Sequence, residues 1–334
     1  MQITAAVTRE SRNRCFPTLA WERLASLGNF RWVDEMPARK GVTETLADQF
    51  AGTEILVTAW GTPPITRDVL DACPNLRHIA HAAGSVAFVD LEAWHRNILV
   101  TNVMPIMALG VSEFTLTCIL SALRRFDALV NPARWDSLPF YKVPKVGQML
   151  RDKTVGLVGL GIIGRQTLDL LRPFNCRIIV HDPFLSAGAA QDLGVELLDL
   201  DTLLKSSDIV SLHAPGTPAT KHLLNRARLA LLRPGSILIN TARGILIDHD
   251  ALADIASAGR IAVYLDVTDP EPLPPEHPLR KLPNVILTPH IAGPTADAWP
   301  LMGNACVAEV ERFLRGENPL YSVTEAQYAN QSTS

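Results

Sequence analysis

The chain has 334 residues, of which 47% are hydrophobic and 19% are charged, and its formal net charge is -3. This length is typical of about two domains, and the apolar share readily supplies folded cores. The slightly acidic balance argues against a nucleic-acid partner, which needs a basic domain or stripe.

The five cysteines argue against a disulfide framework and against a zinc site. They are odd in number, lie far apart and form no Cys-x-x-Cys pair. We therefore expect free thiols, no bound metal and a cytoplasmic location. The first ten residues hold too short an apolar stretch for a signal peptide. No uninterrupted apolar run reaches the roughly 18 residues of a transmembrane helix, so we expect no membrane partner.

The first 103 residues alternate short β-branched runs with helical patterns. The runs predict strands at residues 3–8, 54–58, 77–80 and 98–101. The patterns between them predict helices at residues 17–27, 66–72 and 90–96. This βαβα order predicts a parallel sheet with helices on both faces.

Apolar residues at helical spacing predict a long helix at residues 110–130, which could bridge two domains. Residues 131–152 follow without clear periodicity and carry several prolines and glycines, which predicts an extended arm or linker. A second alternating series then predicts strands at residues 154–158, 176–181, 208–212, 236–240, 260–265 and 285–287. A closing helix is predicted at residues 296–316, and the polar residues 325–334 are expected to fray.

A glycine-rich turn, Gly159-Leu160-Gly161-Ile162-Ile163-Gly164, stands between a predicted strand and a helical pattern. Asp182 ends the next strand at the spacing of the dinucleotide-binding fingerprint, about 20 residues on. A helix N-terminus at the turn offers unpaired N–H groups to a pyrophosphate. The Asp182 carboxylate can accept hydrogen bonds from ribose hydroxyls and would repel a 2′-phosphate. Because no arginine is adjacent, the sequence predicts NAD rather than NADP as the cofactor.

Three charged or titratable residues follow the later strands: Arg243, Glu271 and His290. Their chemistry suits a 2-hydroxy or 2-oxo acid. A guanidinium can bind a carboxylate with two hydrogen bonds and polarise a carbonyl. An imidazole can move one proton near neutral pH, and a nearby carboxylate can orient it. Taken singly, each could equally be a structural residue: a hydrogen-bonded histidine, a solvated loop charge or a helix cap.

Four motifs in this order resemble the D-isomer-specific 2-hydroxyacid dehydrogenase family. They are the glycine turn with Asp182, residues 232–244, residues 265–272 and residues 288–293, and the resemblance covers roughly residues 51–318. It implies an α/β fold of two doubly wound, Rossmann-like domains. A cofactor domain of residues 104–293 would be inserted into a substrate domain made of residues 1–103 and the returning tail, residues 294–334. The resemblance also implies a homodimer built through the long helix and the arm.

The resemblance implies roles for individual residues. Arg243 would bind the substrate carboxylate and 2-oxo oxygen, His290 would be the acid–base residue, and Glu271 would be its partner. The backbone N–H groups of Ala83 and Gly84 would hold the substrate carboxylate. The cofactor-binding residues would be Gly159, Gly161, Ile162, Ile163, Gly164, Asp182, Ala214, Pro215, Thr241, Ala242, Arg243, Asp266, His290 and Gly293.

Other readings remain open. His213 is the rival base, although we interpret it as a structural or cofactor-wall residue. His81 could touch substrate, but a core position is favoured for it and for His78. Trp60 could line the substrate pocket or lie in the core. Met107, residues 86–88 and His249 depart from the family pattern, and the first two suggest a more apolar or larger substrate pocket.

We expect an NAD-dependent oxidoreductase that interconverts a 2-oxo acid and a D-2-hydroxy acid. The alternative from another class is a dinucleotide-sensing binding protein, such as a corepressor of the same fold. A formate-type dehydrogenase is disfavoured because residue 271 is a glutamate and not a glutamine.

Overall fold

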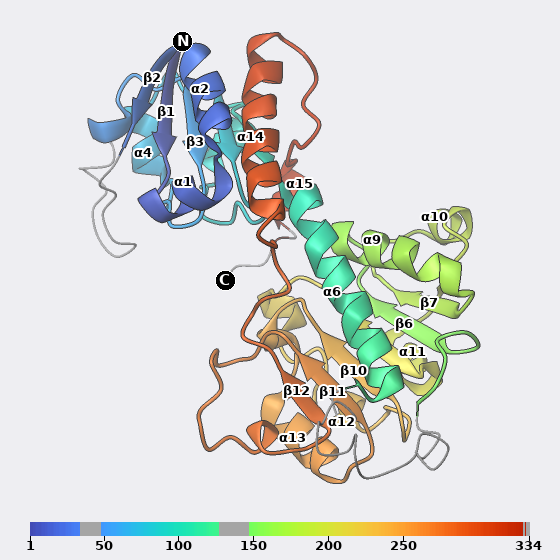
Figure 1. Cartoon of the computed structure of the whole chain (residues 1–334). Helices are drawn as coiled ribbons and strands as arrows, with labels where there is room; N and C mark the ends of the chain where they lie inside the picture. Colours follow the sequence, from blue (N-terminus) through green and yellow to red (C-terminus); the bar gives the residue numbers. More distant parts are fainter. Residues whose placement is uncertain (34–47, 127–146, 330, 332–334) are drawn as a thin grey trace. The chain divides into compact units, whose positions relative to one another are not determined.

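The computed structural model describes residues 1–33, 48–126, 147–329 and 331. It divides into two compact units, each built on its own sheet (Figure 1). We call Met1–Gly110 with Pro294–Ser334 the discontinuous unit, and Val111–Gly293 the inserted unit. The expected fold class, with one Rossmann-like unit inserted into another, is confirmed. The predicted boundary between residues 103 and 104 lies at the start of helix α6 (Met104–Arg124), whereas the two units divide within that helix.

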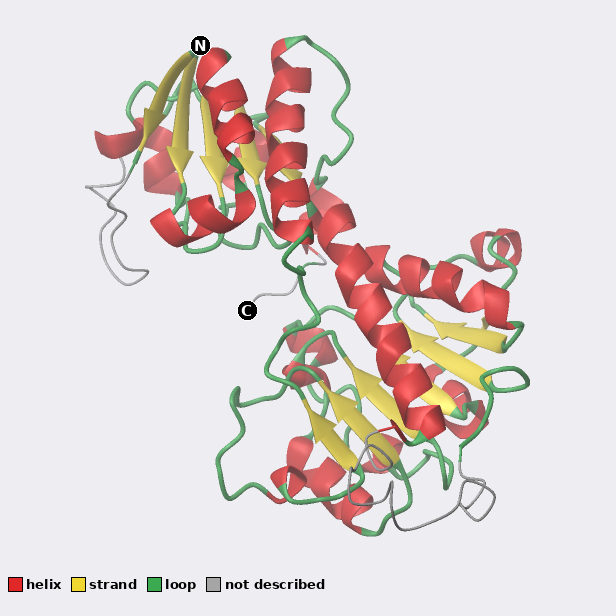
Figure 2. Ribbon diagram, in the orientation of Figure 1, coloured by secondary structure: helices red, strands yellow, loops and turns green. Residues whose placement is uncertain are grey.

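The discontinuous unit has a parallel sheet in the order β2-β1-β3-β4-β5. Its strands are β1 (Gln2–Ala6), β2 (Asn29–Trp32), β3 (Ile55–Thr58), β4 (His78–His81) and β5 (Leu99–Asn102). Helices cover both faces (Figure 2). They are α1 (Arg9–Cys15), α2 (Thr18–Ser26), α4 (Arg67–Ala72), α5 (Glu92–His95), α14 (Ala298–Leu314) and α15 (Glu325–Ala329).

Strand side chains of the discontinuous unit feed two cores, one on each face of the sheet. Ile3 and Val57 join Met302 and Val307 of α14 on one face. Alternate strand residues join side chains of α4 on the other face. The edge strand β2 was not predicted because its four residues are half-buried or exposed and include Asn29 and Arg31, so it lacks the apolar run of an inner strand.

The inserted unit has a seven-stranded parallel sheet in the order β12-β11-β10-β9-β6-β7-β8. Its strands are β6 (Thr154–Val158), β7 (Arg177–His181), β8 (Glu196–Leu197), β9 (Ile209–Leu212), β10 (Ile237–Asn240), β11 (Ala262–Leu265) and β12 (Val285–Leu287). The other helices are α9 (Ile162–Leu171), α10 (Ala187–Asp192), α11 (Leu200–Ser206), α12 (Arg226–Leu229) and α13 (His249–Ser257). The strand order reverses between β6 and β9, and ligands of doubly wound sheets bind outside the carboxyl ends of strands at such a point.

Helix α6 begins earlier than predicted, at Met104, because the side-chain oxygen of Asn102 accepts the Met104 N–H at 3.2 Å. The predicted end of this helix at residue 130 lies outside the described residues, as do residues 131–146 of the arm predicted at residues 131–152. In the described part of the chain, α6 is the one helix long and apolar enough to cross a membrane, a property that core helices share. Its Ile119 and Leu123 are buried in the core of the inserted unit, which accounts for the composition.

All five cysteines are free. Four of them are buried, and Cys176 is half-buried.

Candidate active site

The glycine turn leads from β6 into α9, at the reversal of strand order. Gly159 has φ +95°, and a Cβ there would lie 2.8 Å from the backbone nitrogen of Ala214, so only glycine fits. A Cβ at Gly164 would overlap the Gly159 carbonyl. At Gly161, by contrast, a Cβ would meet nothing within 4 Å. The turn is therefore closely packed at Gly159 and Gly164 but open at Gly161. The first N–H groups of α9, including those of Ile162 and Ile163, lack helical partners.

Asp182 follows β7 and lies against this turn. Its Oδ2 accepts the Leu160 N–H at 2.7 Å, and its Oδ1 accepts the Phe184 N–H at 2.8 Å. Two backbone donors thus fix the carboxylate, and each oxygen keeps further acceptor capacity for ribose hydroxyls. The open glycine turn, the helix N-terminus and this acceptor together fit a nicotinamide dinucleotide. When bound, that cofactor supplies or takes up a hydride.

The loop after β9 packs against the turn from the other side. Gly159 approaches the backbone of His213 and Ala214, and Pro215 continues the loop. The Nε2 of His213 lies 3.0 Å from the Ser211 hydroxyl, and its Nδ1 is buried without a partner among the described residues. Burial lowers the pKa of His213 to about 4. This ring is neutral near pH 7 and contacts no carboxylate among the described residues, so it suits a wall of the cofactor site better than an acid–base role.

Arg243 follows β10 in a loop that Asn240 shapes. The Asn240 side chain accepts the Ala242 N–H and donates to the Arg243 carbonyl. Thr241 is buried, with its hydroxyl 2.9 Å from that of Thr115 in α6. Burial lowers the pKa of Arg243 from its usual value, and the charge of Glu271 opposes this shift. The guanidinium stays protonated at any physiological pH.

Gly244 brings the arginine loop against the loop that carries Glu271. A Cβ at Gly244 would overlap the backbone of Thr268, so glycine permits this close approach. Glu271 then turns back, and its Oε2 accepts the Thr268 N–H at 3.2 Å. Its other oxygen, Oε1, faces the loop that follows β12.

His290 follows β12, and its Nδ1 lies 2.6 Å from the Oε1 of Glu271. The backbone of His290 is in the left-handed region, with φ +54°. Its N–H donates to the carbonyls of Asp266 and Thr288, both at 3.0 Å. About half of each side chain of the His290–Glu271 pair is exposed, so the pair is accessible to a substrate.

The buried carboxylate of Asp266 holds the histidine loop in place. Its Oδ1 accepts the Thr288 hydroxyl at 2.6 Å and the Ile291 N–H at 2.9 Å, and its Oδ2 accepts the Ala292 N–H at 2.9 Å. These three bonds, one to a residue before His290 and two to residues after it, explain how a non-glycine residue keeps a positive φ. The sequence reading missed this scaffolding role of Asp266. Gly293 ends the loop, and a Cβ there would meet nothing within 4 Å.

In the discontinuous unit, the loop after β4 presents a row of backbone donors. Within the described residues, the N–H groups of Ala83, Gly84 and Ser85 have no acceptor. The carbonyl of Ala83 accepts the Val103 N–H at 3.0 Å, and that of Gly84 accepts the Asn102 side chain at 2.5 Å. The loop is therefore held by its carbonyls while its N–H groups stay free, an arrangement that suits an anion.

Of three further candidates in the discontinuous unit, two are buried histidines and the third, Trp60, is half-buried and packs against the core. His78 and His81 are buried, and burial lowers the pKa of each ring to about 3. The His78 Nε2 lies 2.9 Å from the Thr101 hydroxyl, and the His81 Nδ1 lies 2.9 Å from that of Thr58. Trp60 packs edge-on against Trp299 of α14, with ring centroids 4.8 Å apart.

Comparison with known proteins decides the family. Residues 116–292, more than half of the chain, match the NAD binding domain of the D-isomer specific 2-hydroxyacid dehydrogenases. The chain belongs to this family. Its cofactor is therefore a nicotinamide dinucleotide, and its class of activity is that of a 2-hydroxyacid dehydrogenase. The corepressor-like alternative is not favoured.

Named relatives support this assignment. A glyoxylate reductase of Thermofilum pendens is 38% identical over 292 residues, which cover 86% of this chain and 84% of the relative. A D-3-phosphoglycerate dehydrogenase of Methanocaldococcus jannaschii is 35% identical over 292 residues, which cover 85% of this chain but only 54% of that protein. The solved structure of a D-2-hydroxyisocaproate dehydrogenase has a TM-score of 0.75 and 26% identity, covering 97% of this chain and all of the other.

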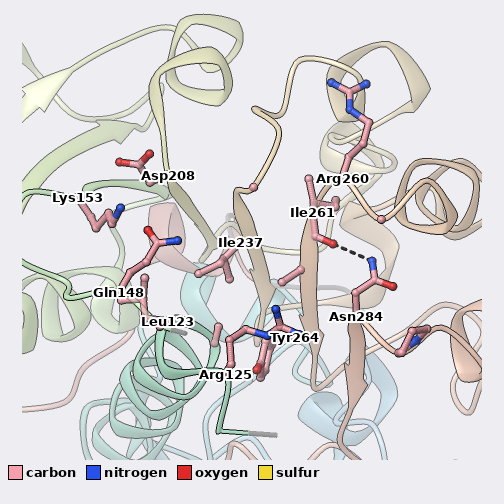
Figure 3. Close-up of a pocket in the computed structure, with 16 residues that line it drawn as sticks. Leu123, Arg125, Gln148, Lys153, Asp208, Ile237, Arg260, Ile261, Tyr264 and Asn284 are labelled. Carbon is pink, nitrogen blue, oxygen red and sulfur yellow. Dashed lines mark hydrogen bonds between the residues drawn. The ribbon is translucent and has the colours of Figure 1, made fainter. Parts of the chain in front are cut away.

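The inserted unit also contains a cavity of about 470 Å³, which lies away from the candidate active-site residues (Figure 3). It is lined by the end of α6, by Gly147 and Gln148, and by residues at or near the starts of β6, β9, β10, β11 and β12, such as Lys153 and Asp208. The glycine turn, Arg243 and His290 follow strand ends at the opposite edge of the sheet. In Figure 3 the side chains of Lys153 and Arg260 lie at opposite sides of the opening and do not converge on one point.

No group of three or more His, Cys, Asp or Glu side chains within the described residues could hold a metal ion.

Proposed function

We propose that the protein is an NAD-dependent D-2-hydroxyacid dehydrogenase that interconverts a 2-oxo acid and a D-2-hydroxy acid, with His290 as its acid–base residue. The observation that carries this proposal is the 2.6 Å contact between His290 Nδ1 and Glu271 Oε1. It lies at the carboxyl edge of the sheet that also carries the nucleotide turn. A histidine held by a carboxylate at this edge is the group that the proton transfer requires.

The contact supports separate roles for the two ring nitrogens of His290. Glu271 holds Nδ1, which fixes the ring orientation and leaves Nε2 to face the substrate oxygen. In reduction, Nε2 donates its proton to the 2-oxo oxygen as that oxygen becomes a hydroxyl. In oxidation, the neutral Nε2 takes the hydroxyl proton. Glu271 stabilises the imidazolium in both directions.

Arg243 would bind the substrate carboxylate and polarise the 2-oxo group. Its side chain packs on Gly216, where an added Cβ would lie 2.9 Å from Arg243 Cγ. Its Nη1 donates to the Ala242 carbonyl at 2.7 Å. Packing and this bond hold the guanidinium in one place, while its remaining donors stay available for a carboxylate.

We propose that the N–H groups of Ala83 and Gly84 hold the substrate carboxylate, and that Ser85 adds a third donor. Hydrogen bonds from neutral donors to a carboxylate are stronger than those between neutral groups. The loop from Ala82 to Val89 contains no lysine or arginine, and Val86 and Phe88 make it apolar. We therefore favour glyoxylate or a 2-oxo acid with an apolar side chain over a phosphorylated substrate.

We propose NAD as the preferred dinucleotide because the Asp182 carboxylate faces the turn and because Pro183 and Phe184, and not an arginine, follow it. A 2′-phosphate would be repelled there. Comparing kcat/KM for NADH and NADPH tests this preference, and equal values would refute it.

The His290→Ala variant tests the whole proposal. Loss of a general acid–base group lowers turnover by about 100- to 10,000-fold, and NADH affinity should stay nearly unchanged. The measurement is loss of nicotinamide absorbance with a series of 2-oxo acids. The control is His222→Asn, which removes an exposed imidazole of the same unit. Full activity of His290→Ala would make His213 the candidate acid–base residue. A wild-type protein that reduces no 2-oxo acid would favour the binding-protein alternative.

We also propose a homodimer in which α6 takes part. A shallow apolar hollow runs between α6 and the strands β11 and β12, lined in part by Phe114, Cys118 and Ile286. Phe126, just beyond α6, is 62% exposed. A second copy could cover this apolar surface. Light scattering over a range of concentrations tests the proposal, and a monomer at every concentration would overturn it.

A further inference from the structure

The C-terminal segment of the discontinuous unit contacts the loop after β4. The Gln331 Oε1 accepts the Val86 N–H at 2.8 Å. The Tyr328 hydroxyl donates to the Val89 carbonyl at 2.8 Å, and its ring lies 4.4 Å from that of Trp94. Residues more than 200 positions away in the sequence thus hold both ends of the segment Val86–Val89.

The Gln331 side chain accepts from one particular donor, the Val86 N–H. Four consecutive N–H groups, from Ala83 to Val86, follow the end of β4, and only that of Val86 has an acceptor in the described part of the chain. Val86 is fully buried, so its N–H would otherwise be unsatisfied away from water. The amide of Gln331 therefore marks where the row of free donors ends.

We propose that Gln331 is a positioning residue for substrate binding. This inference rests on the proposed function of the loop as the carboxylate site. By accepting the Val86 N–H, Gln331 fixes the end of the loop that carries the three preceding free N–H groups. It does so with an uncharged oxygen, which adds no negative charge beside an anion site.

The charge of the acceptor distinguishes positioning from simple structural support. A carboxylate at position 331 would accept the same N–H at least as well. It would also place a negative charge next to the bound substrate carboxylate, and like charges at this range repel. An effect that is purely structural would therefore be rescued by glutamate, whereas the proposed role would not.

The experiment compares Gln331→Ala, Gln331→Glu and the control Gln327→Ala, using the 2-oxo acid that the wild-type protein reduces best. Gln327 belongs to the same segment, but its Oε1 accepts the Thr324 N–H and does not reach the loop. We expect Gln331→Ala to raise the KM of the 2-oxo acid by about 3- to 10-fold, the range for one neutral hydrogen bond. The KM of NADH and kcat should stay within two-fold, as should all constants of Gln327→Ala.

Gln331→Glu should raise the same KM further than alanine does, and added salt should reduce that excess. Inhibition by oxamate, a 2-oxo-acid isostere that cannot be reduced, should weaken by the same factors. Thermal unfolding of each variant checks that the fold is kept. An unchanged KM in Gln331→Ala, or recovery of the wild-type KM in Gln331→Glu, would overturn the inference and leave the proposed function intact. If the wild type reduces no 2-oxo acid, the proposed function itself fails.

Discussion

The glycine turn after β6 and the loop after β4 both present a row of free backbone N–H groups at the carboxyl end of a parallel strand. They do so by different means. After β6 the chain enters helix α9, and the helix end itself leaves N–H groups without partners. After β4 no helix follows, and the donors of Ala83 and Gly84 are set by contacts from Asn102, Val103 and Gln331. The free donors of the turn thus result from local geometry, whereas those of the proposed carboxylate loop depend on residues distant in sequence.

The largest effect that would test this comparison is expected from Gly161→Asp in the turn. The added side chain enters open space, so the fold should be kept. Its carboxylate would compete for the N–H groups of α9 and repel the diphosphate, lowering NADH affinity on the order of 100-fold. The measurement is a fluorescence titration with NADH, beside thermal unfolding. Gly188→Asp is the control, because its Cβ also meets nothing within 4 Å but it lies outside the turn. Unchanged NADH affinity in Gly161→Asp would show that the turn does not bind the cofactor.

The strand before the β4 loop makes the discontinuous unit sensitive to acid. Burial lowers the pKa of His78 and His81 from 6.5 to about 3. The unfolded chain therefore binds protons that the folded chain excludes, and stability is present above pH 6.5 and lost as the pH falls toward 3. At pH 5 each histidine should cost about 2 kcal/mol of unfolding free energy. His81→Gln should show a smaller loss between pH 7 and pH 5.

Tryptophan emission during urea unfolding can follow this loss, because five of the six tryptophans belong to the discontinuous unit: Trp21, Trp32, Trp60, Trp94 and Trp299. Equal losses for His81→Gln and wild type would show that His81 titrates normally in the fold.

A smaller effect is expected from Gly84→Ala in the β4 loop. The added methyl would overlap the terminal methyl of Met107 and lie 2.7 Å from that of Met104. Both are ends of flexible side chains, so the loop should shift slightly and the KM of the 2-oxo acid should rise about 10-fold. The KM of NADH should not change. Adding Met107→Ala should restore part of the substrate affinity, and a double variant no better than Gly84→Ala would assign the effect to the loop backbone alone.

The same distinction explains what could be predicted from the sequence. The turn after β6 was predicted because glycine spacing and Asp182 lie within one continuous segment. Arg243, Glu271 and His290 were predicted from motifs, and the structure shows the contact that joins Glu271 to His290. The scaffolding by Asp266 and the contact of Gln331 with Val86 could not be predicted, because neither residue type nor spacing records a partner on another segment. Edge strand β2 was missed for lack of a buried face.

The return of the chain to the discontinuous unit has a consequence for synthesis. One face of the first sheet, including Ile3, Val57 and Ala80, is covered by Met302, Val307 and Val310 of α14. The ribosome makes those residues only after the whole inserted unit, which is continuous in sequence and can fold while translation proceeds. Helices α1 and α2 share this core, so until α14 emerges the first sheet presents a partly uncovered apolar face to chaperones and to other nascent chains. A transcript cut short near codon 293 would thus yield a complete nucleotide-binding unit tethered to an aggregation-prone half.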